Sequence, residues 1–513
     1  MDRAGNAVTS ATQLNEGSNT LWGMDRLCSA NLYRRRTFNL EDDIFFTGEE
    51  TGNGQEFALD VRNGVLYAVP MMGRAAWESV AMVNPGNRDK VALVVGDDRG
   101  GAYLWLYVGE KNHFGDGSFL DRNGLAYGHL YAWVADNGDT TPEAFHGTGN
   151  LRYGYFAPIE QFNADSAGVP GYDALGYADL ATLDAQAAVA GAFRFSRPED
   201  VQVNPHNDRE VTLASTGRGG LFPSDNWGTM YEIDFYFNRR GPITARIKID
   251  YDADDAGNGQ FSHPDFGLRS PDNLEWAGNG KIYVQEDRST SPGSLFGGTS
   301  GIEASIWEMT HTGQLERIAS MDRTAVPAGQ IDNDPTDLGN WESSGILDVT
   351  DLFFTFPGEQ LLLANVQAHS LTFGSSDRDA ALVQGGQIFF LTDRSHFTPL
   401  DLNLSESDIE TLELGGELAI AEDFQLEQNY PNPFNPTTTI SFSVKNEGMV
   451  TIAIFNQLGQ KVVELVNNVV AAGPHRVVWD GRDALGQKVA SGIYFYKMTA
   501  GDFVKSRKML LTK

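Results

Sequence analysis

The residues best suited to chemistry are carboxylates placed where short apolar runs begin or end. Two such runs, Phe46-Thr47-Gly48-Glu49-Glu50 and Val94-Val95-Gly96-Asp97-Asp98, each close on adjacent acids. Taken singly, a pair of this kind is more typical of a solvated turn. Carboxylates that converge raise one another's pKa, however, and bound cations remove that penalty. The pattern therefore indicates a polynuclear metal site, and calcium suits it because calcium prefers oxygen ligands. The other acids in such settings are Glu78, Glu199, Asp272, Glu286, Asp287 and Glu342.

Other motifs are weaker. The stretch 252–259 resembles a calcium loop, with alternating Asp residues and a Gly near the sixth place. His263 stands where such a loop has its closing Glu, so an ordinary acidic loop is the alternative. Cys28, the only cysteine, would by itself be a small buried hydrophobe. The histidines lack metal-ligand spacing, which disfavours zinc. The sequence has no serine-nucleophile signature and no phosphate-binding loop of the Gly-x-x-x-x-Gly-Lys type.

The elements that must position these acids are short strands. Apolar or alternating runs separated by Gly, Asn and Asp turns recur through the first 400 residues, and 176–189 is the one convincing helix. Many short strands with little helix predict an all-β fold, most simply a β-propeller, with a multi-sandwich protein as the alternative. In a propeller, acids at strand ends point toward the mouth of the central channel. The predicted strands are Asp43–Phe46, Val65–Val69, Val91–Val95, Tyr103–Val108, His129–Trp133, Val211–Leu213, Thr229–Asp234, Lys281–Gln285, Ser305–Met309, Leu361–Asn365 and Gln387–Leu391.

Charge divides the chain. The 513 residues carry a formal net charge of −31, with 41% apolar residues, which excludes wholesale disorder. Residues 424–513 hold 10 basic and 6 acidic residues, and the remainder holds 28 and 63. A body this acidic repels phosphate backbones, so nucleic acid is not an expected partner. No apolar run is long enough for a transmembrane helix, one cysteine permits no internal disulfide, and no signal peptide opens the chain.

We therefore expect a propeller domain over 1–400, an acidic linker over 401–423, and a small antiparallel sandwich over 424–513. The sandwich begins with Asn429-Tyr430-Pro431-Asn432-Pro433-Phe434-Asn435-Pro436, where three prolines forbid helix. Short strands follow, including Thr439–Val444, Val450–Phe455 and Gly492–Met498.

Six short motifs in order resemble the PhoX-type alkaline phosphatases. They are Asp25-Arg26-Leu27-Cys28-Ser29-Ala30, Phe46-Thr47-Gly48-Glu49-Glu50, Gly73-Arg74 through Trp77-Glu78, Gly96-Asp97-Asp98, Arg197-Pro198-Glu199-Asp200 and Pro271-Asp272-Asn273. The resemblance covers about 20–395. It implies a six-bladed propeller with an iron–calcium cluster in its channel, and hydrolysis of phosphate monoesters outside the cytoplasm.

The resemblance also implies roles for single residues. Cys28 resembles the iron-binding cysteine of the family, and Arg197 resembles the arginine that grips the substrate phosphate, a task for which its planar fork is suited. Glu49 or Glu50, Glu78 and Glu199 look like cluster ligands, with Glu199 and Arg197 as the catalytic pair. Further ligands expected more weakly are Asp97, Asp98, Asp272, Glu286, Asp287 and Glu342. The implied mechanism is metal-assisted phosphoryl transfer.

The chain also departs from the family pattern. No Asn-His-Glu-like segment precedes the cysteine motif, as if a first blade and a signal peptide were missing. The segments 140–190 and 290–340 look like divergent insertions. We therefore expect a six-bladed type of propeller that lacks N-terminal strands.

The tail resembles the type IX secretion C-terminal sorting domain. The residues that carry this likeness are 429–440, Ile454-Phe455-Asn456-Gln457-Leu458-Gly459 and Gly492-Ile493-Tyr494. The resemblance implies an immunoglobulin-like sandwich recognised by the outer-membrane translocon. The expected protein is thus a secreted or surface-attached, monomeric, iron- and calcium-dependent phosphatase acting on a small phosphate ester.

Two other functions fit the same sequence. One is a non-catalytic surface propeller that keeps calcium for structure and binds a ligand or glycan. The other is a calcium-dependent propeller lactonase or phosphotriesterase, which would need no cysteine ligand.

Overall fold

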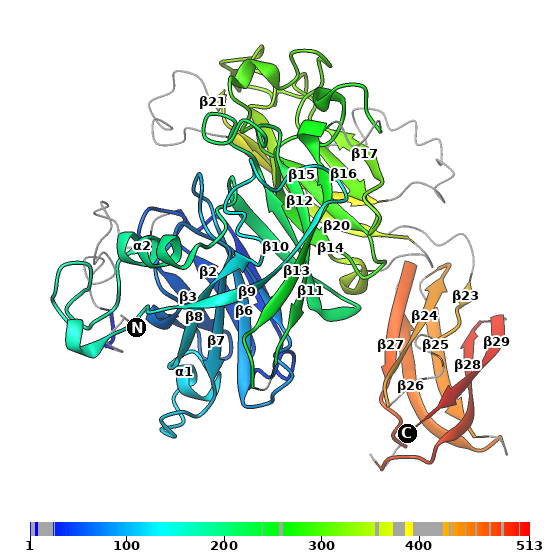
Figure 1. Cartoon of the computed structure of the whole chain (residues 1–513). Helices are drawn as coiled ribbons and strands as arrows, with labels where there is room; N and C mark the ends of the chain where they lie inside the picture. The colour runs from blue at the N-terminus through cyan, green and yellow to red at the C-terminus, as the bar shows by residue number, and fades with distance from the viewer. Residues whose placement is uncertain are drawn as a thin grey trace. The chain divides into compact units, whose positions relative to one another are not determined.

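The computed structural model describes two compact units, Met1–Asp393 and Arg394–Lys513, drawn in Figure 1. The described residues are 1, 6–8, 24, 26–238, 240–255, 260–353, 359–372, 385–392, 424–429, 432, 434, 436–446, 448–456, 459–470, 473–483, 487–501 and 503–512. The predicted linker 401–423 lies outside them.

The first unit is a β-propeller with five antiparallel blades in its described part, and the all-β prediction is confirmed. The first strands of successive blades pack side by side: β1 on β5, β5 on β10, β10 on β14 and β14 on β19. The blades are β1 (Ala30–Tyr33), β2 (Ile44–Gly48), β3 (Glu56–Asp60) and β4 (Val65–Ala68); β5 (Trp77–Val83), β6 (Lys90–Asp97), β7 (Trp105–Glu110) and β8 (Gly128–Ala135); β10 (Pro198–Asn204), β11 (Asn207–Ser215), β12 (Thr229–Tyr236) and β13 (Thr244–Asp252); β14 (Pro271–Trp276), β15 (Ile282–Glu286), β16 (Ser305–Met309) and β17 (Leu315–Ser320); and β19 (Trp341–Asp348), β20 (Leu361–Ala368) and β22 (Gly385–Thr392).

The segment 140–190, predicted as an insertion, joins two blades. Its strand β9 (Leu151–Ile159) pairs with β8 on one side and β13 on the other, so the second and third blades form one nine-stranded sheet. Strand β9 thereby covers two outer edges that would otherwise expose unpaired backbone groups. The same segment holds helix α2 (Leu180–Ala190), which begins after Asp179, whose side chain caps Thr182 N, and ends at Gly191 in the left-handed region.

Small elements complete the unit. They are α1 (Phe119–Arg122), the β18 (Ile331–Asp332) and β21 (Leu371–Thr372) pair, and the 3₁₀ turns η2 (Pro70–Met72), η3 (Ala164–Ser166), η5 (Pro264–Phe266), η6 (Gly293–Leu295) and η7 (Thr350–Leu352). No helix in the described part of the chain is long and apolar enough to cross a membrane.

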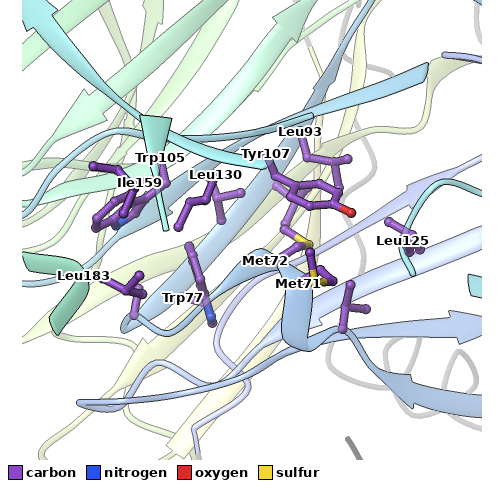
Figure 2. Close-up of a cluster of buried hydrophobic side chains, with 14 of the residues drawn as sticks. Met71, Met72, Trp77, Leu93, Trp105, Tyr107, Leu125, Leu130, Ile159 and Leu183 are labelled. Atoms are coloured by element: carbon purple, nitrogen blue, oxygen red, sulfur yellow. The ribbon is translucent and has the colours of Figure 1, made fainter. Parts of the chain in front are cut away.

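The hydrophobic core lies between blades. Strand β6 sends Val91, Leu93 and Val95 into a cluster with the first blade, and its alternate residues Ala92 and Val94 into a cluster with the third. Both faces of the strand are thus buried, which explains its continuous apolar run in the sequence. Figure 2 shows the first of these clusters, in which Trp77 lies with Leu130, Ile159 and Leu183. The buried indole of Trp77 fixes the backbone from which Glu78 projects.

The second unit is a β-sandwich of two antiparallel sheets with its own core. One sheet is β23 (Gln425–Leu426), β24 (Thr438–Val444) and β27 (Gly473–Trp479), and the other is β26 (Lys461–Val470), β25 (Gly448–Phe455), β28 (Gly492–Ala500) and β29 (Phe503–Leu511). Alternating residues of β24, Ile440, Phe442 and Val444, pack into the core with Trp479 and Tyr496.

Candidate active site

The innermost strands of four blades share a local design. Each carries an acid as its second residue: Glu78 in β5, Glu199 in β10, Asp272 in β14 and Glu342 in β19. A bulge follows in every case, between positions 77 and 80, 198 and 201, 271 and 274, and 343 and 346. Bulges re-aim side chains next to functional sites. The blades therefore direct equivalent carboxylates toward one region.

Three of these acids meet. Glu78, Glu199 and Asp272 are at most 8% exposed, and each offers a carboxylate oxygen within 4.8 Å of the others. Glu78 Oε2 and Asp272 Oδ1 have no hydrogen-bond partner among the described residues. Burial, and then the neighbouring Glu50 charge, raise the pKa of Glu78 well above its ordinary value, and burial does the same for Asp272. Orphaned, buried carboxylate oxygens at this separation suit a cation that would neutralise them.

Arg197 is fixed beside this cluster. Its Nε donates to Asp98 Oδ1 at 2.6 Å, its Nη2 lies 2.8 Å from Glu199 Oε1, and its Nη1 donates to Ser289 Oγ at 2.9 Å. Burial opposes ionisation of Asp98, but the Arg197 charge outweighs it and lowers the Asp98 pKa to about 2. The side chain of Arg197 is 15% exposed, so a bound anion could still contact its guanidinium.

The first blade adds Glu50 and the thiol of Cys28. Glu50 Oε1 lies 2.5 Å from Arg26 Nη2. Burial, together with a hydrogen bond to Asp98, raises the pKa of Glu50 to about 7. Cys28 is exposed as a residue, yet burial of its thiol and a hydrogen bond to Glu50 raise the thiol pKa. The acidic surroundings of Cys28 would favour a thiolate only with a cation bound.

The fifth blade adds Glu342, whose carboxylate neighbours Asp287 of the fourth blade. Glu342 is 7% exposed, and its Oε1 lies 2.7 Å from His369 Nε2. Burial and the charge of Asp287 raise the pKa of Glu342 to about 11. Asp287 follows β15 directly and contributes to the field at both Glu342 and Arg197.

Asp97 and Glu286 occupy a different environment. Asp97 accepts from Arg99 Nε at 2.8 Å and from Trp105 Nε1 at 3.0 Å. Glu286 accepts in the same way from Arg269 Nη2 at 2.8 Å and Trp307 Nε1 at 2.9 Å. Each acid is the last residue of the second strand of its blade, and the structure ties both to protein donors. The next residues, Asp98 and Asp287, are the ones that reach the site.

Glu49 also points to a local partner. Its Oε2 accepts from Gln55 N at 3.0 Å, and its side chain is 1% exposed. Of the two acids left as alternatives by the sequence, Glu50 is the one in contact with Cys28 and Asp98.

Arg269 stabilises the fourth blade. Its side chain, Asp265 and Glu286 are all 0% exposed, and it bonds both acids. Replacing Arg269 with methionine would leave two uncompensated buried charges. We expect the unfolding free energy of the propeller to fall by about 3–5 kcal/mol in urea denaturation. Arg34→Met, which removes an exposed pair 4.0 Å apart, should change it by less than about 1 kcal/mol. Equal effects of the two variants would contradict this role.

A large open cavity lies over the cluster. Its volume is about 1310 Å³, and Glu50, Asp98 and Arg197 form part of its wall. Five of its lining residues are arginines: Arg26, Arg99, Arg197, Arg218 and Arg288. In a body with 63 acidic residues, this concentration of guanidinium groups favours an anionic ligand.

The sequence did not indicate every residue at the site. Thr216 Oγ1 donates to Glu199 Oε1, and Ser289 Oγ holds Arg197. Thr216 and His369 each follow the second strand of their blade, in the position that Asp98 and Asp287 occupy elsewhere. This shared position could have identified both residues, but it is recognised only when the blades are aligned with one another.

The residues present fit bound cations. The observation that decides this is the buried trio Glu78, Glu199 and Asp272, with orphaned oxygens on two of its members. Carboxylates suit calcium and iron, and the nearby thiol of Cys28 suits iron.

Fold and site together define a β-propeller protein with a buried carboxylate centre beneath an arginine-lined cavity. Residues 28–356 match the family model of alkaline phosphatase PhoX, and 432–502 match that of the FlgD Ig-like domain. The chain belongs to the PhoX alkaline phosphatase family.

Solved structures give distant similarities. PhoX of Pseudomonas fluorescens, in complex with the transition-state analogue vanadate, is 17% identical over 66% of this chain and 57% of its own, with a TM-score of 0.45. PorZ, a surface component of the type-IX secretion system of Porphyromonas gingivalis, is 12% identical over 94% and 59%, with a TM-score of 0.21. Latent PorU of the same organism is 10% identical over 86% and 34%, with a TM-score of 0.16. The chain spans less than two thirds of each of these proteins. Among curated proteins, none matches.

Proposed function

We propose that this protein is a metal-dependent phosphatase that hydrolyses phosphate monoesters at the mouth of the propeller channel. The observation that carries the proposal is the buried trio Glu78, Glu199 and Asp272 directly beside Arg197. A cation centre next to a fixed guanidinium is the arrangement that phosphoryl transfer requires. Membership of the family supports the same assignment.

In this proposal the trio holds iron and calcium, with Cys28, Glu50, Asp98, Asp287 and Glu342 as further ligands. The cations would neutralise phosphoryl oxygens and activate an oxygen nucleophile. Asp97 and Glu286 are left out because protein donors bind both carboxylate oxygens of each. Glu49 is left out because Glu50 is the acid in contact with Cys28 and Asp98.

Arg197 binds and orients the phosphate. Asp98, Glu199 and Ser289 hold its guanidinium at the cavity wall before substrate arrives. A donor fixed in advance stabilises developing charge without the cost of reorganisation. Arg26, Arg218 and Arg288 attract the anionic substrate into an otherwise acidic protein.

We further propose that the second unit directs the protein through the type IX secretion translocon to the cell surface or medium. The Pro-rich entry 429–436 and the likeness of this tail to type IX sorting domains support the assignment. The match to an Ig-like domain model accords with the sandwich expected of such a domain.

A substrate panel tests the proposed activity. Full-length protein, reconstituted with iron and calcium, should hydrolyse p-nitrophenyl phosphate at least about 100-fold faster than the corresponding diester or triester or a lactone. The reason is that Arg197 and the cations would bind a terminal phosphoryl group and stabilise its developing charge. Preferred cleavage of a triester or lactone would favour the lactonase and phosphotriesterase alternative. If metal-loaded protein hydrolyses none of these compounds, the result would favour the other alternative, a non-catalytic propeller that binds a ligand.

A further inference from the structure

A second group of metal-ligating side chains lies between the third and fourth blades and shares no member with the proposed catalytic centre. Glu210 of β11, Glu232 of β12 and His311, in the turn between β16 and β17, each offer one ligand atom, and these atoms all lie within 4.8 Å of one another. His311 Nδ1 is 3.6 Å from Glu210 Oε1 and 3.6 Å from Glu232 Oε2. Both distances are too long for a hydrogen bond. They match the separation of about 3.3–3.6 Å between ligand atoms around a tetrahedral zinc ion.

The two carboxylates are oriented by protein donors. Glu210 Oε2 accepts from Asn204 Nδ2 at 3.0 Å and from Asn207 Nδ2 at 2.9 Å. Glu232 Oε1 accepts from Arg246 Nη2. The other oxygen of each glutamate is the one that faces the imidazole. Carboxylates that bind metals are commonly held in this way, because an outer hydrogen bond fixes the orientation of the ligand.

Thr212 provides a second, independent observation at the same place. It follows Glu210 by two residues on β11 and pairs with Glu232 on β12, so the three side chains share one face of the sheet. The alternate residues Val211 and Leu213 pack into the core shared with the second blade. Thr212 is 1% exposed, and its Oγ1 has no hydrogen-bond partner among the described residues. Such a hydroxyl is costly unless it is satisfied, and a water bound to a metal at this cluster would satisfy it.

The ion-pair network around the cluster is acidic overall. Its acids and bases are Glu210, Glu232, Asp234, Asp250, Arg246 and Lys248. With a neutral imidazole, four negative and two positive charges leave a net charge of −2. Lys248 Nζ lies 2.6 Å from Asp250 Oδ1 but 3.8 Å from Glu232 Oε2, and burial, then the Asp250 charge, raise the pKa of Glu232 despite the nearby cations. A divalent cation would balance the remaining charge.

The turn that carries His311 is fixed against the third blade. Gly313 N donates to Thr310 O at 2.8 Å. Gly313 has a φ of +77°, and a Cβ there would lie 2.5 Å from Asp250 O, so the turn packs directly on β13. The imidazole ring also lies over Trp276, with 5.9 Å between the ring centroids. The imidazole is therefore held beside the two glutamates before a metal binds.

We propose that Glu210, Glu232 and His311 bind a divalent transition metal, with zinc as the best fit, at a site separate from the catalytic cluster. One imidazole nitrogen with two carboxylate oxygens is a donor set for zinc, whereas calcium takes oxygen donors. The side chain of His311 is 53% exposed, so water can complete the coordination. The ligands come from two blades, and the ion would cross-link them. The sequence-based argument against zinc considered the spacing between histidines, which a site with one histidine does not show.

Zinc binding to the full-length protein tests this site without a measurement of activity. Protein loaded with iron and calcium is dialysed against zinc and then analysed for bound metal. The wild type should hold about one zinc per chain more than His311→Ala, and Glu210→Gln should weaken zinc binding at least about tenfold. A large excess of calcium should not displace this zinc. His206→Ala is the matched control, because His206 also reaches the fourth blade but contacts the carbonyl of Gly278, at 3.1 Å. It should bind zinc as the wild type does.

Zinc should also raise the melting temperature of the wild type and of His206→Ala, and His311→Ala should lose this rise. Equal zinc content in the wild type and His311→Ala would overturn the proposal, as would displacement of the zinc by calcium. A protonated His311 that only pairs with the two glutamates would give a different result: His311→Ala would lower the melting temperature equally with and without zinc, and that result would also overturn the proposal. The exposed position of His311 makes its replacement compatible with folding. Hydrolysis is not measured, so failure here is distinct from failure of the phosphatase proposal.

Discussion

Arg197→Ala should lower kcat/KM for p-nitrophenyl phosphate by about 10³-fold, measured on protein with its full metal content. A fixed guanidinium that stabilises transferring phosphoryl oxygens contributes effects of this order. Most of the loss should be in kcat, because the charge it meets is greatest in the transition state. Arg197→Lys should give an intermediate loss, since an ammonium retains the charge but not the fork that spans Asp98, Glu199 and Ser289.

Arg246 provides a matched control. It is on the same blade and also binds two acids, Glu232 and Asp234, but it does not line the cavity. Arg246→Ala should leave kcat/KM within about twofold, because loss of a partly exposed pair has a small, local effect. If the Arg197→Ala protein keeps both its metals and its activity, Arg197 has no role in the mechanism.

Asp272→Asn and Glu78→Gln should each release at least one bound cation per chain, measured by elemental analysis after dialysis. Both changes keep the shape of the side chain and remove a negative ligand. Activity should fall with the metal content. In a chelator, however, the same variants should be more stable than the wild type by about 1–3 kcal/mol, because a buried, unpaired carboxylate has been removed. With cations present the order of stability should reverse, and the wild type should be more stable than either variant.

The pH dependence of the metal-free protein has a definite sign. Burial raises the pKa values of Glu78 and Asp272 well above 4.5 and 3.8 in the folded state. The folded protein then binds more protons than the unfolded chain, so stability falls as the pH rises through and above the unfolded pKa values. Each variant should show a flatter profile than the wild type, and added cations should flatten the wild-type profile.

Asp97→Asn separates a ligand from a structural acid. Asp97 is bound by Arg99 and Trp105, so its replacement should reduce stability equally with and without cations and leave the metal content unchanged. Loss of metal from Asp97→Asn would show that Asp97 is a metal ligand. A metal content unchanged in Asp272→Asn and Glu78→Gln would contradict the cluster assignment.

The sequence predicted the strands that have simple patterns. The apolar run of β6 and the alternating run of β24 are both strands, and the helix predicted over 176–189 lies at 180–190. The strands not predicted include β5, β10, β14 and β19, which are the innermost strands of four blades. Each begins with Trp or Pro followed by an acid and then a bulge, so neither period of two nor apolar content marks it. The residues that build the site break the pattern by which strands are recognised.

The same limit applies to the site. Adjacent acids such as Asp97-Asp98 and Glu286-Asp287 look equivalent in sequence, and only the register against the inner strand separates them. Asp97 and Glu286 pair with Trp77 and Pro271 across the sheet and turn to protein donors, whereas the next residue reaches the cluster.

The most direct test follows hydrolysis and metal content on one sample of full-length protein. Chelation should remove iron and calcium and reduce p-nitrophenyl phosphate hydrolysis at least about 100-fold, and re-addition of both cations should restore activity in proportion to the metal bound. A protein that carries its cations on Glu78, Glu199 and Asp272 and still releases no phosphate, or one that hydrolyses the ester equally well without metal, would contradict this account.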